Sequence, residues 1–320
     1  MGTTAELNVA PGGMGLSLAK KACDAAETKI STLDAMLSIF NGQGLVSRIN
    51  KNNKKKVVKV SPELFRLAKR AKEYFVLTQG AFDITVEPLT QIWGFGPEKK
   101  TLPEAKAITE VLRYVGLDKI KLDEKSKTFT FKDARVKMDF GAIAKGYAVD
   151  EAVKIFKARG IKEGLINIGG DLYCMGAKPG SKSWFIGIRD PENKGNILAT
   201  LQLHDKAIAT SGTYENFYIY NNKRYSHIID PRTGYPVINN ITSATVIADD
   251  CTTADALATA VFVLGEHKAV TLIESLPDIE CFLIISKDGR SEFIISSGME
   301  RYIKRDETQK KSFGRDERRH

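Results

Sequence analysis

The sequence lacks the features that mark several large classes of protein. No stretch of its 320 residues approaches the roughly 20 uninterrupted apolar residues of a membrane-spanning helix. The first residues, MGTTAELNVA, lack the basic segment and apolar run of an export signal. No segment matches the G-x-G-x-x-G fingerprint or the P-loop. The sequence therefore excludes a membrane-spanning helix within these residues and the two standard nucleotide-binding motifs.

Cysteine is also scarce, and its spacing excludes two kinds of site. The four cysteines are far apart and form no C-x-x-C pair: Cys23, Cys174, Cys251 and Cys281. The usual zinc and redox motifs are therefore absent. Buried free thiols are the expected state, although an even number of cysteines also permits disulfides, so the redox compartment stays open.

The positive charge is unevenly spread along the chain. The formal net charge is +9, and residues 301–320 hold eight Lys or Arg against four Asp or Glu. A second basic cluster, KNNKKKVVK at 51–59, lacks the interleaved aromatic residues of a base-stacking platform. We therefore expect no nucleic-acid partner, while a weak attraction to anionic lipid or an acidic partner stays open. We expect a main domain over 1–304 and a basic, disordered tail over 305–320.

Helical spacing dominates the first half of the chain and strand-like alternation the second. Apolar side chains recur at helical spacing in four segments: 15–37, 61–80, 101–116 and 144–160. Ser61 and Pro62 predict the start of the second of these helices. Alternation over 117–140 predicts paired strands around a turn at 124–126, and further strand-like segments follow as far as residue 298. Early helices and late strands without regular alternation predict an α+β fold.

The segment CTTADALATAVFVLG at 251–265 combines a helix signal with possible metal ligands. It predicts a helix begun by Thr252 or Thr253. Asp255 and Thr259 are four residues apart and therefore share one helix face. A carboxylate and a hydroxyl are hard oxygen donors that suit Mg²⁺. The alternative is that Asp255 interacts with the helix dipole and Thr259 is simply buried.

Three glycine-containing segments could approach a phosphate group: FGAIAKG at 140–146, NIGGDL at 167–172 and TSGTYENF at 210–217. A glycine-rich turn lets backbone N–H groups contact a phosphate, and Lys145 could add a positive charge. Asp139 ends the strand-like run VKMDF before the first turn, where it could accept hydrogen bonds from ribose or flavin. Each segment could instead be an ordinary turn, Asp139 a turn cap and Lys145 a surface lysine.

Two further segments carry candidate site residues. GAFDITVEPL at 80–89 places a small, an aromatic and an acidic residue after a helix end: Ala81, Phe82 and Asp83. SHIIDPRTGYPV at 226–237 places His227 at the end of a strand, and imidazole titrates near neutral pH. A core phenylalanine and a structural histidine are the alternatives.

In this order, the segments strongly resemble the ApbE family of FAD:protein FMN transferases, from MGT at 1–3 to ADALAT at 254–259. The specific markers are GAFDITVEPLTQIWGFG, MDFGAIAKGYAVD, INIGGDLYCMG, AIATSGTYENF, RYSHIIDPRTGYPV and ADALATAVFVLG. The resemblance implies a T-fold-like α+β architecture of two packed lobes, with largely antiparallel sheets, flanking helices and the flavin between the lobes.

The resemblance also implies the residues that bind the substrate and the metal. Contacts to FAD would come from Met1, Phe40, Ala81, Phe82, Asp83, Asp139, Lys145 and the Ile229 backbone. The Mg²⁺ ligands would be the carbonyls of Ala142 and Ala258 and the side chains of Asp255 and Thr259.

The chain departs from the family pattern at a few positions. Phe40 stands where tyrosine is common, so a hydroxyl is lost but a ring that can stack on the isoalloxazine is kept. Gly44 and Leu45 replace a Ser-Glu pair, and Thr213 replaces a frequent aspartate. These changes concern flavin affinity and the choice of acceptor more than the fold.

The implied reaction is Mg²⁺-dependent attack by a Thr or Ser hydroxyl on the FMN-side phosphorus of FAD, with AMP leaving. The acceptors would be flavoprotein subunits of membrane redox complexes. A metal held by Asp255 would neutralise charge on the pyrophosphate. His227 would accept the proton of the hydroxyl, with Asp230 or a metal-bound water as alternatives. Two other functions stay open: an FAD pyrophosphatase that uses water, and a non-catalytic FAD-binding protein.

The resemblance finally implies a location. Bacterial ApbE-like proteins commonly work outside the cytoplasmic membrane behind an export signal or lipid anchor. We therefore expect a periplasmic protein whose precursor extends upstream of Met1, with membrane association through a segment outside this chain.

Overall fold

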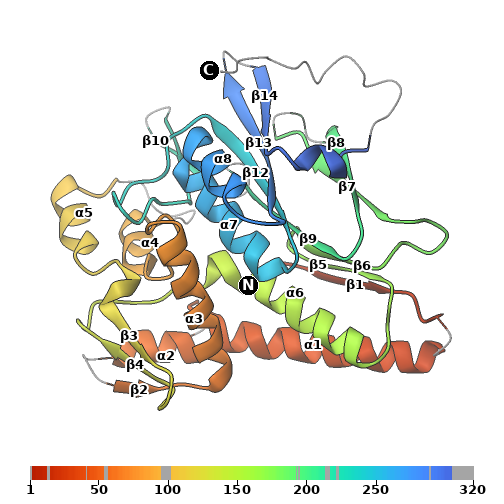
Figure 1. The fold of residues 1–320 in the computed structure, drawn as a ribbon. Helices are drawn as coiled ribbons and strands as arrows, with labels where there is room; N and C mark the ends of the chain where they lie inside the picture. The colour runs from red at the N-terminus through yellow and green to blue at the C-terminus, as the bar shows by residue number, and fades with distance from the viewer. Residues whose placement is uncertain are drawn as a thin grey trace.

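A seven-stranded antiparallel sheet is the largest layer of the protein (Figure 1). The structure is a computed structural model that describes residues 2–12, 15–40, 42–53, 57–94, 102–191, 193, 195–212, 217–220, 223–287 and 290–304. In spatial order the strands are β1 (Ala5–Val9), β5 (Gly164–Ile168), β6 (Asp171–Met175), β9 (Lys206–Gly212), β12 (Ile241–Ala248), β13 (Glu280–Lys287) and β14 (Arg290–Ile295). Every neighbouring pair is antiparallel.

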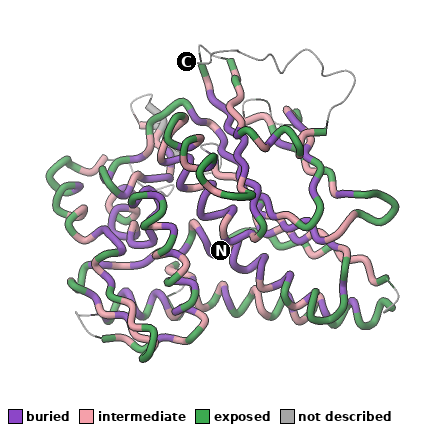
Figure 2. Tube along the Cα trace, viewed as in Figure 1, coloured by how far each residue is buried: buried purple, intermediate pink, exposed green. Residues whose placement is uncertain are grey.

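Four helices lie beside this sheet; the last three contact its strands, and the first packs on the second. They are α1 (Leu16–Leu37), α6 (Gly141–Ala158), α7 (Cys251–Leu264) and α8 (Glu266–Glu274). The central one is α7, which contacts β9 and β12 of the sheet as well as α6 and α3 (Pro62–Leu77). Figure 2 shows that burial is concentrated in α7 and the facing sides of its neighbours. This helix is apolar on nearly all faces because it is surrounded by protein.

A smaller group of elements lies on one side of the molecule, below and to the left in Figure 1. It contains α2 (Leu45–Asn52), α3, α4 (Glu87–Trp93), α5 (Ala105–Leu112) and a sheet of order β2-β4-β3 (Val57–Lys59, Thr128–Phe131, Ile120–Asp123). The remaining elements are η2 (Leu117–Lys119), η3 (Met299–Tyr302) and two hairpins, β7–β8 (Trp184–Arg189, Ile197–Leu203) and β10–β11 (Phe217–Tyr220, Lys223–Ser226). The predicted α+β class with largely antiparallel sheets and flanking helices is confirmed.

Several predicted elements are present with the expected ends. The first helix spans Leu16–Leu37, and the second begins at Pro62 after Ser61, whose side chain accepts a hydrogen bond from the Leu64 N–H at 3.2 Å. The third predicted helix, at 101–116, is shorter in the structure, where α5 spans only Ala105–Leu112. The hairpin turn predicted at 124–126 joins β3 to β4.

Two predictions around residue 140 are wrong. FGAIAKG is not a turn, because α6 begins at Gly141 and contains the rest of that segment. The run 136–140 is not a strand, since its backbone bonds to two asparagine side chains and to the Ile84 carbonyl, none of which belongs to a strand. Asn53 donates to the Val136 carbonyl, and Asn50 exchanges two hydrogen bonds with the backbone of Met138.

The start predicted for the helix at 251–265 is also wrong. It begins at Cys251 and is capped by Asp250, not by Thr252 or Thr253. The Asp250 carboxylate accepts from the Thr253 N–H at 2.9 Å, which an aspartate at the preceding position does readily.

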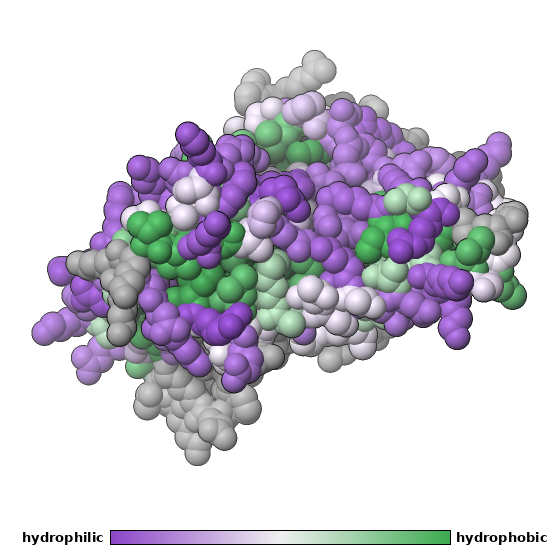
Figure 3. All heavy atoms as spheres, turned by 90° about the horizontal axis from the view of Figure 1, so that it is seen from below, coloured by the Kyte–Doolittle hydropathy of each residue, from purple (hydrophilic) through white to green (hydrophobic). Residues whose placement is uncertain are grey.

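Seen from below, hydrophobic surface is confined to separate patches within a mostly hydrophilic surface (Figure 3). Within the described residues, no helix combines the length and apolar character needed to cross a membrane. The four cysteines are free thiols, and all but the half-buried Cys23 are buried. Residues 305–320, the predicted tail, lie outside the described residues.

At Gly146 the backbone of α6 packs directly against α7. A Cβ atom at this position would lie 2.2 Å from the Cys251 carbonyl oxygen and 2.8 Å from the Asp255 Cβ. Real atoms cannot approach so closely, so the two helices pack at this distance only because residue 146 has no side chain.

We predict that Gly146→Ala lowers the free energy of unfolding by roughly 1 to 3 kcal/mol, because the new methyl group must push α7 away. Urea denaturation of the two proteins measures this difference. Helix propensity alone predicts the opposite sign, a gain of roughly 0.5 to 1 kcal/mol. A variant more stable than the wild type would show that the two helices can move apart without a loss of stability.

Candidate functional site

A cavity of about 630 Å³ lies where α6 and α7 meet the ends of several other elements. Eleven of the predicted site residues line it: Phe40, Ala81, Phe82, Asp83, Asp139, Ala142, Lys145, His227, Ile229, Asp255 and Thr259. Ala258 is fully buried and is not among the lining residues, and Met1 lies outside the described residues. Segments spread over most of the chain therefore meet at one place.

Lys145 and Asp255 form the polar centre of the cavity. Lys145 Nζ lies 3.1 Å from Asp255 Oδ1 and 2.8 Å from Asp171 Oδ2. The other oxygen of Asp255 accepts the Gly146 N–H at 3.0 Å. Burial alone would lower the pKa of Lys145, but the two carboxylates hold that pKa above its ordinary value, so the lysine is charged.

Asp171 lies in the NIGGDL segment and is not among the predicted site residues. It is 1% exposed at the start of β6, directly after the turn formed by Gly169 and Gly170. Burial raises its pKa, and the charge of Asp255 raises it further. Its type and place after a tight turn were visible in the sequence, but its contact with Lys145 depends on the packing of α6 against β6.

Thr259 lies one helical turn after Asp255 and faces the end of strand β9. Its hydroxyl is 3.3 Å from the hydroxyl of Ser211, which also lines the cavity. Ser211 was not predicted, although the AIATSG segment that contains it was recognised. The two hydroxyls and the Asp255 carboxylate are hard oxygen donors on one wall.

The Asp255 carboxylate and the hydroxyls of Thr259 and Ser211 are donors that fit a small divalent cation. Among the described residues no group of three or more His, Cys, Asp and Glu side chains is placed to hold a metal. The predicted ligand set, however, uses a single carboxylate together with a hydroxyl and main-chain carbonyls. Such a set suits Mg²⁺, which binds to one or two carboxylates and completes its shell with water and substrate phosphates.

Asp83 lines the cavity, but its carboxylate also bonds to the surrounding loops. Oδ1 accepts from the N–H and the hydroxyl of Thr85, both at 2.7 Å, and Oδ2 accepts from the Leu117 N–H at 3.1 Å. Burial raises the pKa of Asp83 from 3.8 to about 6, although these hydrogen bonds oppose the shift. Asp83 thus holds the cavity wall together.

The neighbouring aromatic residues take two different positions. Phe82 is 1% exposed and packs edge-to-face on Tyr74 with ring centroids 5.9 Å apart, so it belongs to the core as well as to the wall. Phe40 is 91% exposed, more than any other large hydrophobic side chain of the described residues. An aromatic ring left in water at the edge of a cavity is a surface on which a planar ligand can stack.

Asp139 and His227 are two further residues that line the cavity. Asp139 Oδ1 accepts the N–H of Gly141, the first residue of α6, at 2.8 Å, while burial raises the pKa of Asp139. His227 follows β11 and lines the cavity. Asp230 does not line it, and both of its oxygens accept hydrogen bonds from the Arg232 side chain at 2.8 and 2.9 Å.

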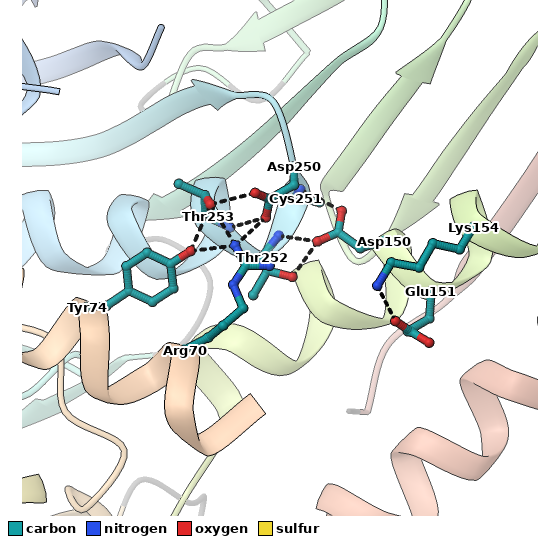
Figure 4. Close-up of polar contacts among 9 residues, drawn as sticks. All are labelled: Arg70, Tyr74, Asp150, Glu151, Lys154, Asp250, Cys251, Thr252 and Thr253. Atoms are coloured by element: carbon teal, nitrogen blue, oxygen red, sulfur yellow. Dashed lines mark hydrogen bonds and ion pairs between the residues drawn. The ribbon is translucent and has the colours of Figure 1, made fainter. Parts of the chain in front are cut away.

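The N-terminus of α7 is fixed from two neighbouring helices (Figure 4). The Asp150 carboxylate, from α6, accepts the N–H groups of Cys251 and Thr252 at 2.7 and 2.9 Å and also bonds the Thr252 hydroxyl. Arg70, from α3, donates to Asp250 at 2.8 Å. Since α7 carries Asp255 and Thr259, this network sets their position relative to α6.

Comparisons with known proteins find relatives over most of the chain. The sequence model of the ApbE family matches residues 1–283. The FAD:protein FMN transferase of Haemophilus influenzae is 32% identical over 296 residues, which cover 90% of this chain and 85% of the relative. That of Salmonella typhimurium is 33% identical over 264 residues, which cover 80% and 75%.

Solved structures show the same similarity in three dimensions. The ApbE protein of Thermotoga maritima superposes with a TM-score of 0.86 at 30% identity, covering 95% of this chain and 97% of its own. The flavin transferase ApbE from Vibrio cholerae superposes with a TM-score of 0.84 at 29% identity, covering 94% and 96%.

We predict that Asp150→Ala lowers the free energy of unfolding by about 2 kcal/mol or more, because it leaves buried N–H groups at the start of α7 without an acceptor. The matched control is Glu151→Ala on the same helix, which removes ion pairs with the exposed Lys154 and, at 3.8 Å, with Lys29, and should change stability by less than about 1 kcal/mol. Equal effects in chemical denaturation would refute the anchoring role of Asp150.

A pH dependence follows from the raised pKa of Asp83. The folded protein binds the proton of Asp83 more tightly than the unfolded chain, so this contribution to stability is complete below about pH 4 and is lost as the pH rises through about 6. Between pH 4 and 7 the wild type should lose up to about 3 kcal/mol of unfolding free energy relative to Asp83→Asn. Parallel curves for the two proteins would contradict the assignment.

Proposed function

The chain belongs to the ApbE family and is a transferase enzyme, and from this premise we propose that it moves the FMN half of FAD to a threonine or serine hydroxyl of an acceptor flavoprotein, with Mg²⁺ and with release of AMP. One observation carries the proposal: a single cavity gathers the oxygen donors of α7, the Lys145 ammonium and the exposed Phe40 ring. Charged groups for a pyrophosphate and a ring for a flavin are thus available to one ligand.

The chemistry requires charge to be stabilised on phosphate oxygens. The acceptor hydroxyl oxygen forms a bond to the FMN-side phosphorus, the bond to the AMP oxygen breaks, and AMP leaves with that electron pair. Asp255, Thr259 and the carbonyls of Ala142 and Ala258 would hold Mg²⁺, which when bound supplies positive charge to the pyrophosphate. Lys145 provides a second positive charge from the same wall.

The acceptor hydroxyl must also lose a proton, and His227 is the group we propose to accept it. It lines the cavity and carries a side chain that can exchange a proton near neutral pH. The alternative, Asp230, is less suitable because both of its carboxylate oxygens bond to Arg232 and it is not among the lining residues.

The flavin would occupy the side of the cavity formed by Phe40 and the segment 81–83. We propose that Phe40 stacks on the isoalloxazine ring, which would cover its exposed face. Asp139 and the backbone of Ile229 would contact the ligand from the same cavity, where both are lining residues. The loss of a tyrosine hydroxyl at position 40 leaves this stacking possible.

The family resemblance supports two further parts of the proposal. We place the enzyme at the extracytoplasmic face of the inner membrane and its acceptors among the flavoprotein subunits of membrane redox complexes. Fractionation of cells that express the protein from its native gene, followed by its detection in the periplasmic or membrane fraction, tests this location. Recovery in the cytosol alone would refute it.

The decisive assay incubates the protein with FAD and Mg²⁺, with and without an acceptor flavoprotein, and follows AMP and in-gel flavin fluorescence. Release of AMP that depends on the acceptor, with fluorescence on the acceptor band, is expected. Release of AMP without acceptor would show that water is the nucleophile instead. A protein that binds FAD without releasing AMP would be a storage protein.

We predict that Asp255→Asn folds, still binds FAD and transfers no FMN at Mg²⁺ concentrations that saturate the wild type, because it removes the charge that holds the cation. The control is Asp249→Asn, which changes a carboxylate that pairs with Lys206 outside the cavity. Melting temperature and Mg²⁺-dependent AMP release are measured on the same preparations. Wild-type turnover with an unshifted Mg²⁺ requirement in Asp255→Asn would refute the metal assignment.

A further inference from the structure

Lys145 contacts two buried carboxylates that come from different elements. Asp171 belongs to β6 and Asp255 to α7, and their side chains are 1% and 4% exposed. Lys145 itself reaches them from α6 and is 24% exposed on the cavity side. When both carboxylates are ionised, one ammonium faces two negative charges, and the cluster keeps a net charge of −1.

Asp255 has both of its oxygens engaged in this state. Oδ1 bonds the Lys145 ammonium, and Oδ2 bonds the Gly146 N–H. The N–H belongs to a helix backbone that cannot move away, so the lysine is the partner that can be exchanged. A divalent cation at this carboxylate must therefore compete with the ammonium for Oδ1.

Asp171 allows that exchange to occur without leaving a buried charge unpaired. It lies 2.8 Å from Lys145 Nζ, closer than Asp255 does, and so it can keep the ammonium in the cavity when the contact with Asp255 is lost. An ammonium with no second partner would have to remain on Asp255 or pass into solvent.

We propose that Lys145 is an internal cation that occupies Asp255 until a divalent metal displaces it, and that Asp171 is the positioning residue that retains it beside the substrate phosphates. The inference rests on the proposed function in one respect, the binding of the metal at Asp255. Because the displaced ammonium is then available to a phosphate, metal and FAD assist each other's binding.

The test measures the binding of Mg²⁺ alone, without FAD, by isothermal titration calorimetry. Lys145→Gln should bind Mg²⁺ at least about tenfold more tightly than the wild type, because the competing charge is gone. Asp171→Asn should bind it more weakly, because Lys145 then has only Asp255 as a partner. The control is Lys206→Gln, which removes a lysine paired with Asp249 outside the cavity and should leave Mg²⁺ affinity unchanged.

The double variant Lys145→Gln/Asp171→Asn distinguishes the exchange of Lys145 for the metal from a simple effect of local charge on Mg²⁺ affinity. If Asp171 acts through Lys145, the effect of Asp171→Asn on Mg²⁺ affinity should largely disappear in the Lys145→Gln background. Strictly additive effects would overturn the positioning role of Asp171. Unchanged Mg²⁺ affinity in Lys145→Gln would overturn the competition itself.

Stability provides a second readout in case Lys145→Gln folds poorly. The variant leaves two buried carboxylates without their cation, so its melting temperature should be lowered and Mg²⁺ should raise it by more than it raises that of the wild type. A melting temperature that Mg²⁺ does not restore would contradict the proposal. If these variants do not behave as expected, Asp255→Asn shows which assignment has failed. If Asp255→Asn binds Mg²⁺ as tightly as the wild type, the metal assignment is wrong. If Asp255→Asn loses Mg²⁺ binding, only the exchange between Lys145 and the metal is wrong.

Discussion

The site depends on the contact between two helices at one glycine. At Gly146 the α6 backbone comes close enough to α7 for its N–H to bond the Asp255 carboxylate. That bond orients the carboxylate, and the same helix turn brings Lys145 to the other oxygen. The side chains of the polar centre are thus placed by backbone packing, and the large sheet and α3 serve to hold the two helices in that relation.

The network at the start of α7 extends this constraint. Asp150 lies one helical turn after Gly146 on α6 and bonds the first N–H groups of α7. Two points of attachment on one helix fix both the separation and the rotation of the other. This explains why α7, which is almost entirely buried, can still present Asp255 and Thr259 to a cavity in a defined direction.

Much of the fold and of the site could be predicted from the local sequence. The predictions that failed share one cause, which is contact between residues far apart in the sequence. Ser61 and Pro62 predict the start of a helix correctly, because helix capping depends on residues next to each other in the sequence. The two glycines of FGAIAKG locally favour a turn. In the structure Gly146 is instead required by the close packing of α7, whose Asp255, 109 positions away in sequence, accepts its N–H. The run 136–140 alternates like a strand, yet Asn50 and Asn53 take its backbone bonds. Asp171 and Ser211 escaped prediction because their partners come from distant elements.

The pairing of β1 with β5 has a consequence for how the protein is made. Residues 5–9 form the edge of the large sheet only by joining residues 164–168, and Gly2 and Thr3, just before β1, line the same cavity as Thr259. A ribosome-bound fragment that ends before α7 therefore possesses the first wall of the cavity but lacks the last. Because contacts so distant in sequence require long loops to close, we expect the cavity to be completed only after α7 has left the ribosome.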